Sequence, residues 1–218
     1  MKTDAQIQTD VIQELKWDPS VTHEHIGVAV RDGIVTLAGT VPTCIEKIHA
    51  EKAVQRVGGV NAVVEKIDVK IPGSFLKDDQ DIAKAIIDQL RWHVQVPDVV
   101  KATVEKGWVE LTGEVDWEYQ RRAAENVVRG LAGVRGVLNK IGIKPRPVHS
   151  YEIKDKIEHA LKRAAEREAR NLTIDVQGGK VTLSGKVRSF EDLAAVRGAA
   201  WSAPGVTFVD DDNLRVAA

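Results

Sequence analysis

One glycine-punctuated pattern occurs three times along the chain, and it limits the possible folds more than any other feature of the sequence. In each copy a glycine is followed by a segment in which apolar and polar residues alternate. These first glycines are 74 and then 72 residues apart, at Gly33, Gly107 and Gly179. A second marker keeps both spacings, at Gly59-Val60, Gly133-Val134 and Gly205-Val206. Two independent markers at one period indicate three tandem modules.

The same succession of local patterns fills each copy. Apolar residues at helical spacing come first, and two segments with the alternation of half-buried strands follow, joined by the glycine. Because glycine adopts positive φ at low cost, these two strands are predicted to form a hairpin. A second helix with a stripe of small apolar residues and a closing strand complete the copy. The apolar positions of the first helix are Ile7, Val11 and Leu15, then Ile82, Ile86 and Leu90, then Ile153, Ile157 and Leu161.

This order of elements predicts an α+β fold of three αββαβ modules, each a three-stranded sheet with two helices on one face. The modules are expected at 1–71, 79–145 and 150–218, with linkers at 72–78 and 146–149. The alternating segments exclude the helical solenoids that many repeats of this length form. Such a sheet leaves its other face open. We therefore expect that face to be covered by self-association or by a protein partner.

Residue types around the second helix of each copy predict how that helix begins and ends. Thr43 and Glu46 have capping-box spacing, and Ser189 with Asp192 is a looser version of it. In the middle copy Asp116 is expected to cap the helix. The glycines of the second marker are predicted to be C-cap glycines, and the third strand is predicted to start at the valine that follows each of them.

Charge and the ends of the chain bear on partners and location. The formal net charge is -1, and no copy is strongly basic, so nucleic acid is not an expected partner. The single cysteine, Cys44, excludes an intramolecular disulfide. The first residues run into a helical pattern without an apolar leader, and no apolar run approaches the ~20 residues that span a bilayer. We expect a cytoplasmic protein, with peripheral contact to a membrane surface as a further expectation.

The repeated residues resemble the BON domain, a bacterial module named after osmotically induced and nodulation proteins. Its pattern is a D-G-x-V-x-L-x-G-x-V hairpin, an alanine-rich helix and a G-V-x-x-V strand. The resemblance covers nearly the whole chain. The matching segments are 32–41 with 59–63, 107–115 with 133–137, and 179–187 with 205–209.

The resemblance implies an αββαβ fold with no catalytic residues and no cofactor. Members of the family are mostly periplasmic or associated with the outer membrane, and several are thought to bind phospholipid. A cytoplasmic branch carrying an additional LysM domain is associated with potassium binding. The resemblance thus implies a non-catalytic binding or scaffold protein of bacterial stress or envelope homeostasis. Two alternatives remain open: peripheral binding to anionic phospholipid, and a cytoplasmic sensor of potassium or another cation.

Three groups of residues carry possible site chemistry. His23 and His25 offer two imidazoles at a strand entrance, but the sequence places no third metal ligand near them. Asp210, Asp211 and Asp212 are weak candidates for cation ligands, and the alternative is an exposed sheet edge protected by charge. One additional residue in this strand predicts a β-bulge. Cys44 lies near a helix start, but its position carries no cysteine in the other copies, so an ordinary small residue is the preferred interpretation.

Aromatic residues of the second copy are the strongest candidates for a lipid or partner surface. Trp108 alternates with buried positions, so it is predicted to point from the open sheet face. Trp117, Tyr119, Arg121 and Arg122 open the second helix, and aromatic residues together with arginine suit a membrane interface or a protein hot spot. The remaining tryptophans of interest are predicted to shield the end of the core, and they are Trp17 and Trp92.

Overall fold

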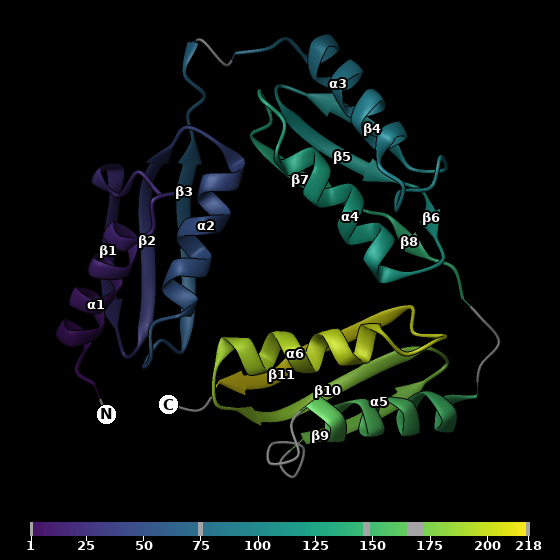
Figure 1. Cartoon of the computed structure of the whole chain (residues 1–218). Helices are drawn as coiled ribbons and strands as arrows, with labels where there is room; N and C mark the ends of the chain where they lie inside the picture. Colours follow the sequence, from purple (N-terminus) through teal and green to yellow (C-terminus); the bar gives the residue numbers. More distant parts are fainter. Residues whose placement is uncertain (1, 74–75, 146–148, 165–171, 217–218) are drawn as a thin grey trace. The chain divides into compact units, whose positions relative to one another are not determined.

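The computed structural model describes residues 2–73, 76–145, 149–164 and 172–216, which form three modules (Figure 1). Parts of both predicted linkers, residues 74–75 and 146–148, lie outside the described residues. In the first module the elements are α1 Asp4–Trp17, η1 His23–His25, β1 Ile26–Arg31, β2 Ile34–Val41, α2 Cys44–Gln55 and β3 Ala62–Val69.

In the described residues of the other two modules the helices and strands follow the same order, and in the second module the central and last strands are each divided in two. In the second module they are α3 Asp79–Trp92, β4 Lys101–Glu105, β5 Trp108–Thr112, β6 Glu114–Val115, α4 Glu118–Arg129, β7 Gly136–Asn139 and β8 Gly142–Ile143. In the third module they are α5 Ser150–Ala164, β9 Leu172–Gln177, β10 Lys180–Val187, α6 Phe190–Trp201 and β11 Phe208–Val216.

Each three-stranded sheet has its second strand in the centre, and β6 and β8 of the second module form a separate two-stranded sheet. The strand orders are β1-β2-β3, β4-β5-β7 and β9-β10-β11. The first strand pairs antiparallel to the central one through the hairpin, whereas the last strand pairs parallel to it. A parallel partner requires a crossover, and the second helix of each module supplies it. The predicted α+β class with three αββαβ modules is confirmed, and both helices of a module cover one sheet face (Figure 1).

The core of each module lies between its helices and the central strand. All nine apolar positions predicted for the first helices are buried. The central strands add Val35 and Leu37, Val109 and Leu111, and Val181 and Leu183, all at most 1% exposed. Small residues of the crossover helix, such as Ala50, Ala124 and Ala200, are fully buried, so this helix approaches the sheet closely. We call the uncovered side of each sheet the open face.

The two glycine markers of the repeat meet in space. Gly33 follows Asp32 in a two-residue turn, and both have positive φ, as a type I′ hairpin requires. The Asn61 N–H donates to the Gly33 carbonyl at 2.9 Å, and a Cβ on Gly33 would lie 3.2 Å from the Gly59 carbonyl. In the second module a Cβ on Gly107 would lie only 2.7 Å from the equivalent carbonyl. The shared period of the markers therefore reflects one contact, made three times.

This contact also corrects two predictions about the second marker. The crossover helices end at Gln55, Arg129 and Trp201, so the marker glycines are not C-caps but turn residues further along, with φ near +90°. The third strands begin two residues later than predicted, because the valine of each marker lies in the same turn and points into the core. In the second module this strand is also divided into β7 and β8.

The N-termini of the crossover helices differ from one module to the next. Thr43 and Ser189 accept N–H groups three residues on, at 3.2 and 3.1 Å, as predicted. The Glu46 side chain does not complete the predicted capping box at the start of its own helix, because its buried carboxylate accepts the Thr22 N–H at 2.5 Å. The predicted Asp116 cap is wrong. Trp117 occupies the N-cap position, and the α4 residue Gln120 accepts the backbone N–H groups of both residues.

Candidate binding surfaces

The open face of the second module carries two exposed apolar side chains on neighbouring strands. Trp108 of β5 is 57% exposed, and Leu138 of β7 is 51% exposed. Trp108 pairs with Gly136, and a Cβ on this glycine would lie 2.3 Å from the indole ring. The ring therefore occupies the space that a side chain at position 136 would fill. Beside it, Lys140 and Glu110 form an ion pair of 2.7 Å.

The open faces of the other modules differ in chemistry at the equivalent positions. In the first module Ile34 and Val64 are 42% and 39% exposed. In the third module Lys180 lies over the ring of Phe208 at 5.5 Å and forms an ion pair with Asp210 at 3.1 Å. The three modules therefore share a core and a topology but differ in their open faces. That face is apolar in the first module, aromatic in the second, and both aromatic and charged in the third.

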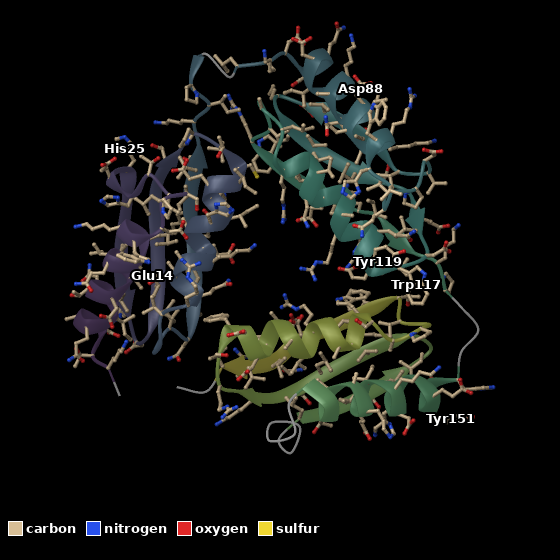
Figure 2. All side chains as sticks on the ribbon, viewed as in Figure 1. Glu14, His25, Asp88, Trp117, Tyr119 and Tyr151 are labelled. Atoms are coloured by element: carbon tan, nitrogen blue, oxygen red, sulfur yellow. The ribbon has the colours of Figure 1, made fainter. Side chains whose placement is uncertain are left out.

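The second predicted surface lies at the start of α4, and Figure 2 labels two of its residues, Trp117 and Tyr119. Tyr119 is 54% exposed, whereas Trp117 is half-buried at the N-cap. Arg121 pairs at 2.6 Å with Glu118, which lies one helical turn earlier in α4. Burial raises the pKa of Glu118, although Arg121 acts in the opposite direction. Tyr119 and Arg122 are thus the exposed members of the group.

The structure does not bring all five predicted surface residues together. Trp108 lies on the open face, while α4 covers the opposite face of the same sheet. No single flat surface can contact both groups. They are two candidate surfaces, and each requires its own test.

Two further tryptophans correct a prediction. Trp17 and Trp92 end the first helices of their modules and are 83% and 86% exposed, so they do not shield the end of the core. Close to Trp92, Val94 is 98% exposed. The physical reason is that each helix ends there and the following residue turns away in an extended conformation.

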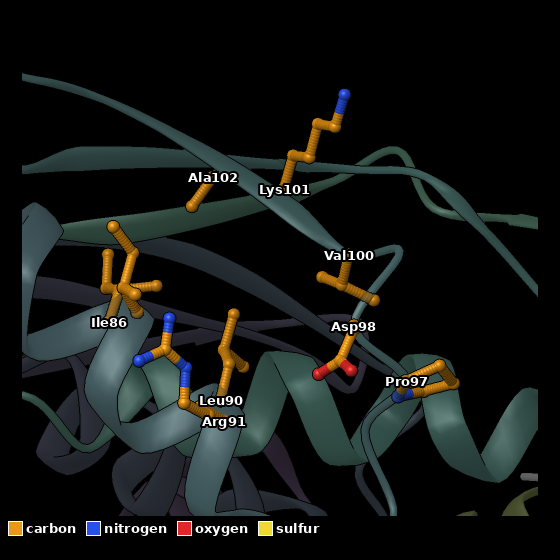
Figure 3. A pocket seen from close by; sticks show the side chains of 9 residues that line it. Ile86, Leu90, Arg91, Pro97, Asp98, Val100, Lys101 and Ala102 are labelled. Carbon is orange, nitrogen blue, oxygen red and sulfur yellow. The ribbon is translucent and has the colours of Figure 1, made fainter.

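A pocket of about 620 Å³ lies between α3 and the start of β4 (Figure 3). Ile86, Ile87 and Leu90 of the helix line one side, and Val100 and Ala102 line the strand side. Ala102 stands five residues before the turn glycine. The larger side chains of Val28 and Ile174 hold that position in the other modules, and a smaller residue leaves space beneath the helix.

The candidate metal ligands do not converge. Asp210 pairs with Lys180, while the Arg197 Nε of α6 donates to Asp211 at 2.7 Å. The predicted bulge is present between the strands, where the register shifts, and it sends neighbouring carboxylates in different directions. Within the described residues, no three or more His, Cys, Asp or Glu side chains come close enough together to hold a metal ion. His23 and His25 therefore gain no third ligand among these residues.

Cys44 is buried at the first position of α2, and burial raises the pKa of its thiol. A protonated, buried thiol is a poor nucleophile. This agrees with the interpretation of Cys44 as an ordinary small residue. In the described part of the chain, no helix is both long and apolar enough to cross a membrane.

Comparison with known proteins identifies the module. The sequence pattern of the BON domain matches three times, at residues 3–71, 78–145 and 151–218. The chain belongs to the BON-domain family. Osmotically-inducible protein Y of Escherichia coli strain K12 is 27% identical over 151 residues, which are 65% of this BON protein and 73% of the relative.

Solved structures similar to this BON protein include two of CdsD, a structural protein of the type III secretion system of Chlamydia trachomatis. The C-terminal domain of CdsD is 13% identical with a TM-score of 0.28, and covers 99% of this chain and 100% of that one. The PrgH periplasmic domain is 11% identical with a TM-score of 0.23, and covers 89% and 96%.

The sequence pattern predicted strand β4 itself, but it did not show that the edge of this strand is free or that a pocket lies beside it. The signal that identifies them is a difference between aligned BON modules rather than a shared residue. Ala83 follows the first buried isoleucine of α3, where Gln8 stands in α1, and Ala102 replaces a larger residue in β4. Such differences become informative only once the register of the hairpins is known.

Proposed function

We propose that this BON protein is a non-catalytic binding protein of the osmotic stress response, and that the open face of its second module binds a protein partner. The exposed pair Trp108 and Leu138 carries the proposal. Membership of the BON family and similarity to an osmotically inducible relative support the physiological setting. Similar apolar exposure at Ile34 in the first module supports a general role for open faces.

The geometry of Trp108 suits a binding hot spot. Large aromatic side chains dominate the energetics of protein interfaces, particularly where few rotamers must be fixed on binding. The absence of a side chain at Gly136 lets the indole lie on β7 before any partner arrives. The Lys140–Glu110 pair at its side supplies polar groups for the rim of an interface.

Complementation of a strain that lacks the gene tests this proposal. We expect the wild-type chain to restore growth after an osmotic upshift, and we expect Trp108→Ser to fail at equal protein abundance. Trp17→Ser is the matched control, because it removes an exposed tryptophan that lies outside both candidate surfaces. Full rescue by Trp108→Ser would refute the role of the open face.

A second candidate function is peripheral binding to anionic phospholipid at the start of α4, which the exposure of Tyr119 beside Arg122 favours. Co-sedimentation with phosphatidylglycerol vesicles tests it. The variant Tyr119→Ser/Arg122→Gln should lose pelleting, while Trp108→Ser should retain it. Equal pelleting of all three proteins would remove this candidate.

A further inference from the structure

Strand β4 has a free edge. Among the described residues it pairs only with β5, and its hairpin register places Glu105 opposite Trp108 and Thr103 opposite Glu110. In a two-residue hairpin the pair next to the turn is hydrogen-bonded, and bonded pairs then alternate along the strands. The backbone N–H and C=O groups of Ala102 and Val104 therefore point outward, where a further strand can reach them.

The equivalent edge of the first module is partly closed by a side chain. Gln8 of α1 donates its Nε2 to the outward carbonyl of Val28 at 2.7 Å. The aligned helix residue in the second module is Ala83, which has no group to donate. Native sheets usually blunt a free edge with such devices, so the uncapped edge of β4 is a place for pairing.

The sequence of β4 is complementary to itself in one antiparallel register. With Thr103 opposite its own copy, Lys101 faces Glu105, and Ala102 faces Val104. The outward backbone groups of Ala102 and Val104 then meet as hydrogen-bonded pairs, and the exposed Lys101 and Glu105 lie opposite each other at both ends. We propose that two copies of this chain associate through their β4 edges in this register, as a two-fold symmetric pair.

The other two modules lack this complementarity. The aligned central residue of β9 is Asp175, which would face its own copy as a like-charged pair. In β1 the residues at the two ends are Gly27 and Arg31, which offer no pair of opposite charges. If two copies of β4 paired in parallel and in register, Lys101 would face Lys101 and Glu105 would face Glu105. Like charges therefore disfavour only the parallel arrangement. The surface is therefore specific to the second module and to one orientation.

The pocket beside β4 supplies the apolar part of the interface. In the proposed register Val104 of the second copy stands opposite Ala102, on the side of the sheet that α3 covers. Its side chain faces the mouth of the pocket, next to Ile87, which is 55% exposed on α3. Two α3 helices would lie side by side across the two-fold axis. Pairing of two copies through β4 thus accounts for the small side chain at position 102 and for the exposure of Ile87.

Sedimentation velocity of the full chain, up to about 1 mM, tests the proposal through charge exchange. The wild type should show a monomer–dimer equilibrium. Lys101→Glu alone and Glu105→Lys alone should each weaken it by about tenfold or more, because each variant places like charges opposite each other twice. A mixture of the two single variants should form a heterodimer, and the double variant should again dimerise like the wild type.

Two substitutions taken from the other modules complete the test. Thr103→Asp introduces the residue that β9 carries at this exposed position, and Ala83→Gln introduces the cap of the first module. Both should fold normally by circular dichroism and remain monomeric. A wild type that stays monomeric, a Thr103→Asp variant that dimerises, or charge variants whose mixture does not associate would overturn the proposal. None of these results depends on the open-face residue Trp108, so failure here is distinguishable from failure of the proposed function.

Discussion

Gly178 and Gly179 are adjacent in the hairpin turn of the third module, and together they test why the repeat requires its glycines. Their φ angles are +54° and +88°. A Cβ on Gly178 would meet no heavy atom within 4 Å, whereas one on Gly179 would lie 2.6 Å from the Gly205 carbonyl. The position of Gly178 is held by Asp32 and Lys106 in the other modules, at similar φ.

We expect Gly179→Ala to lower the free energy of unfolding of this module by about 2 to 3 kcal/mol, and Gly178→Ala by less than about 1 kcal/mol. The left-handed backbone costs alanine about 1 kcal/mol at either position. The lower conformational entropy of alanine in the unfolded chain offsets part of that cost. Only at Gly179 must the Gly205 carbonyl also move. That movement weakens the 2.9 Å bond from the Thr207 N–H to the Gly179 carbonyl, worth about 1 kcal/mol.

Native-state hydrogen exchange of the β10 amides at increasing urea concentration measures the difference module by module. The β2 amides serve as an internal reference, because the substitutions lie in another module. A small domain has a total stability of roughly 5 kcal/mol, so a loss of this size is readily resolved. Equal destabilisation by the two substitutions would refute the role assigned to the contact between the two markers.

Three other measurements follow from local geometry. Asp79→Ala removes the carboxylate that accepts two turn amides of the second module at 2.7 and 2.9 Å, and should cost about 1 to 2 kcal/mol by urea unfolding; no loss would contradict this. Cys44 should react slowly with a disulfide reagent at neutral pH until the first module unfolds, and rapid reaction of the native chain would show the thiol to be accessible. Hydrogen bonds from Ser20, and then from Arg56, lower the pKa of Asp18 to about 2. The ionised carboxylate therefore stabilises the first module above the unfolded pKa of about 3.9, and that contribution is lost as pH falls from there through about 2. In Asp18→Asn, the free energy of unfolding should fall less steeply with decreasing pH in this range than in the wild type. Parallel plots of unfolding free energy against pH for the two proteins would exclude the effect.

Much of the fold follows from residue patterns that act locally. Helical spacing at Ile7, Val11 and Leu15 and alternation through Val35 and Leu37 specify a helix and a strand wherever they occur, because each pattern places its apolar residues on one side. The turn glycines were also predictable. The boundaries of the third strands and the role of the second glycine were not, since they depend on a contact between segments far apart in the sequence.

The candidate surfaces depended more strongly on tertiary structure. Alternation alone predicts that the Trp108 side chain points outward from the open face, and its exposure agrees with that prediction. Sequence could not show that Asp210 and Asp211 pair with different partners, Lys180 and Arg197. Those outcomes are set by which side chains other elements bring within reach.

The sequence by itself determined the threefold repeat, the hairpins and the shared core, because burial and backbone conformation impose the same residues on every copy. Tertiary structure alone decided which strand edges are free and which exposed residues share a face. Those properties arise from strand order and register, which bring Gln8 to Val28 in one module and leave Ala102 uncapped in another.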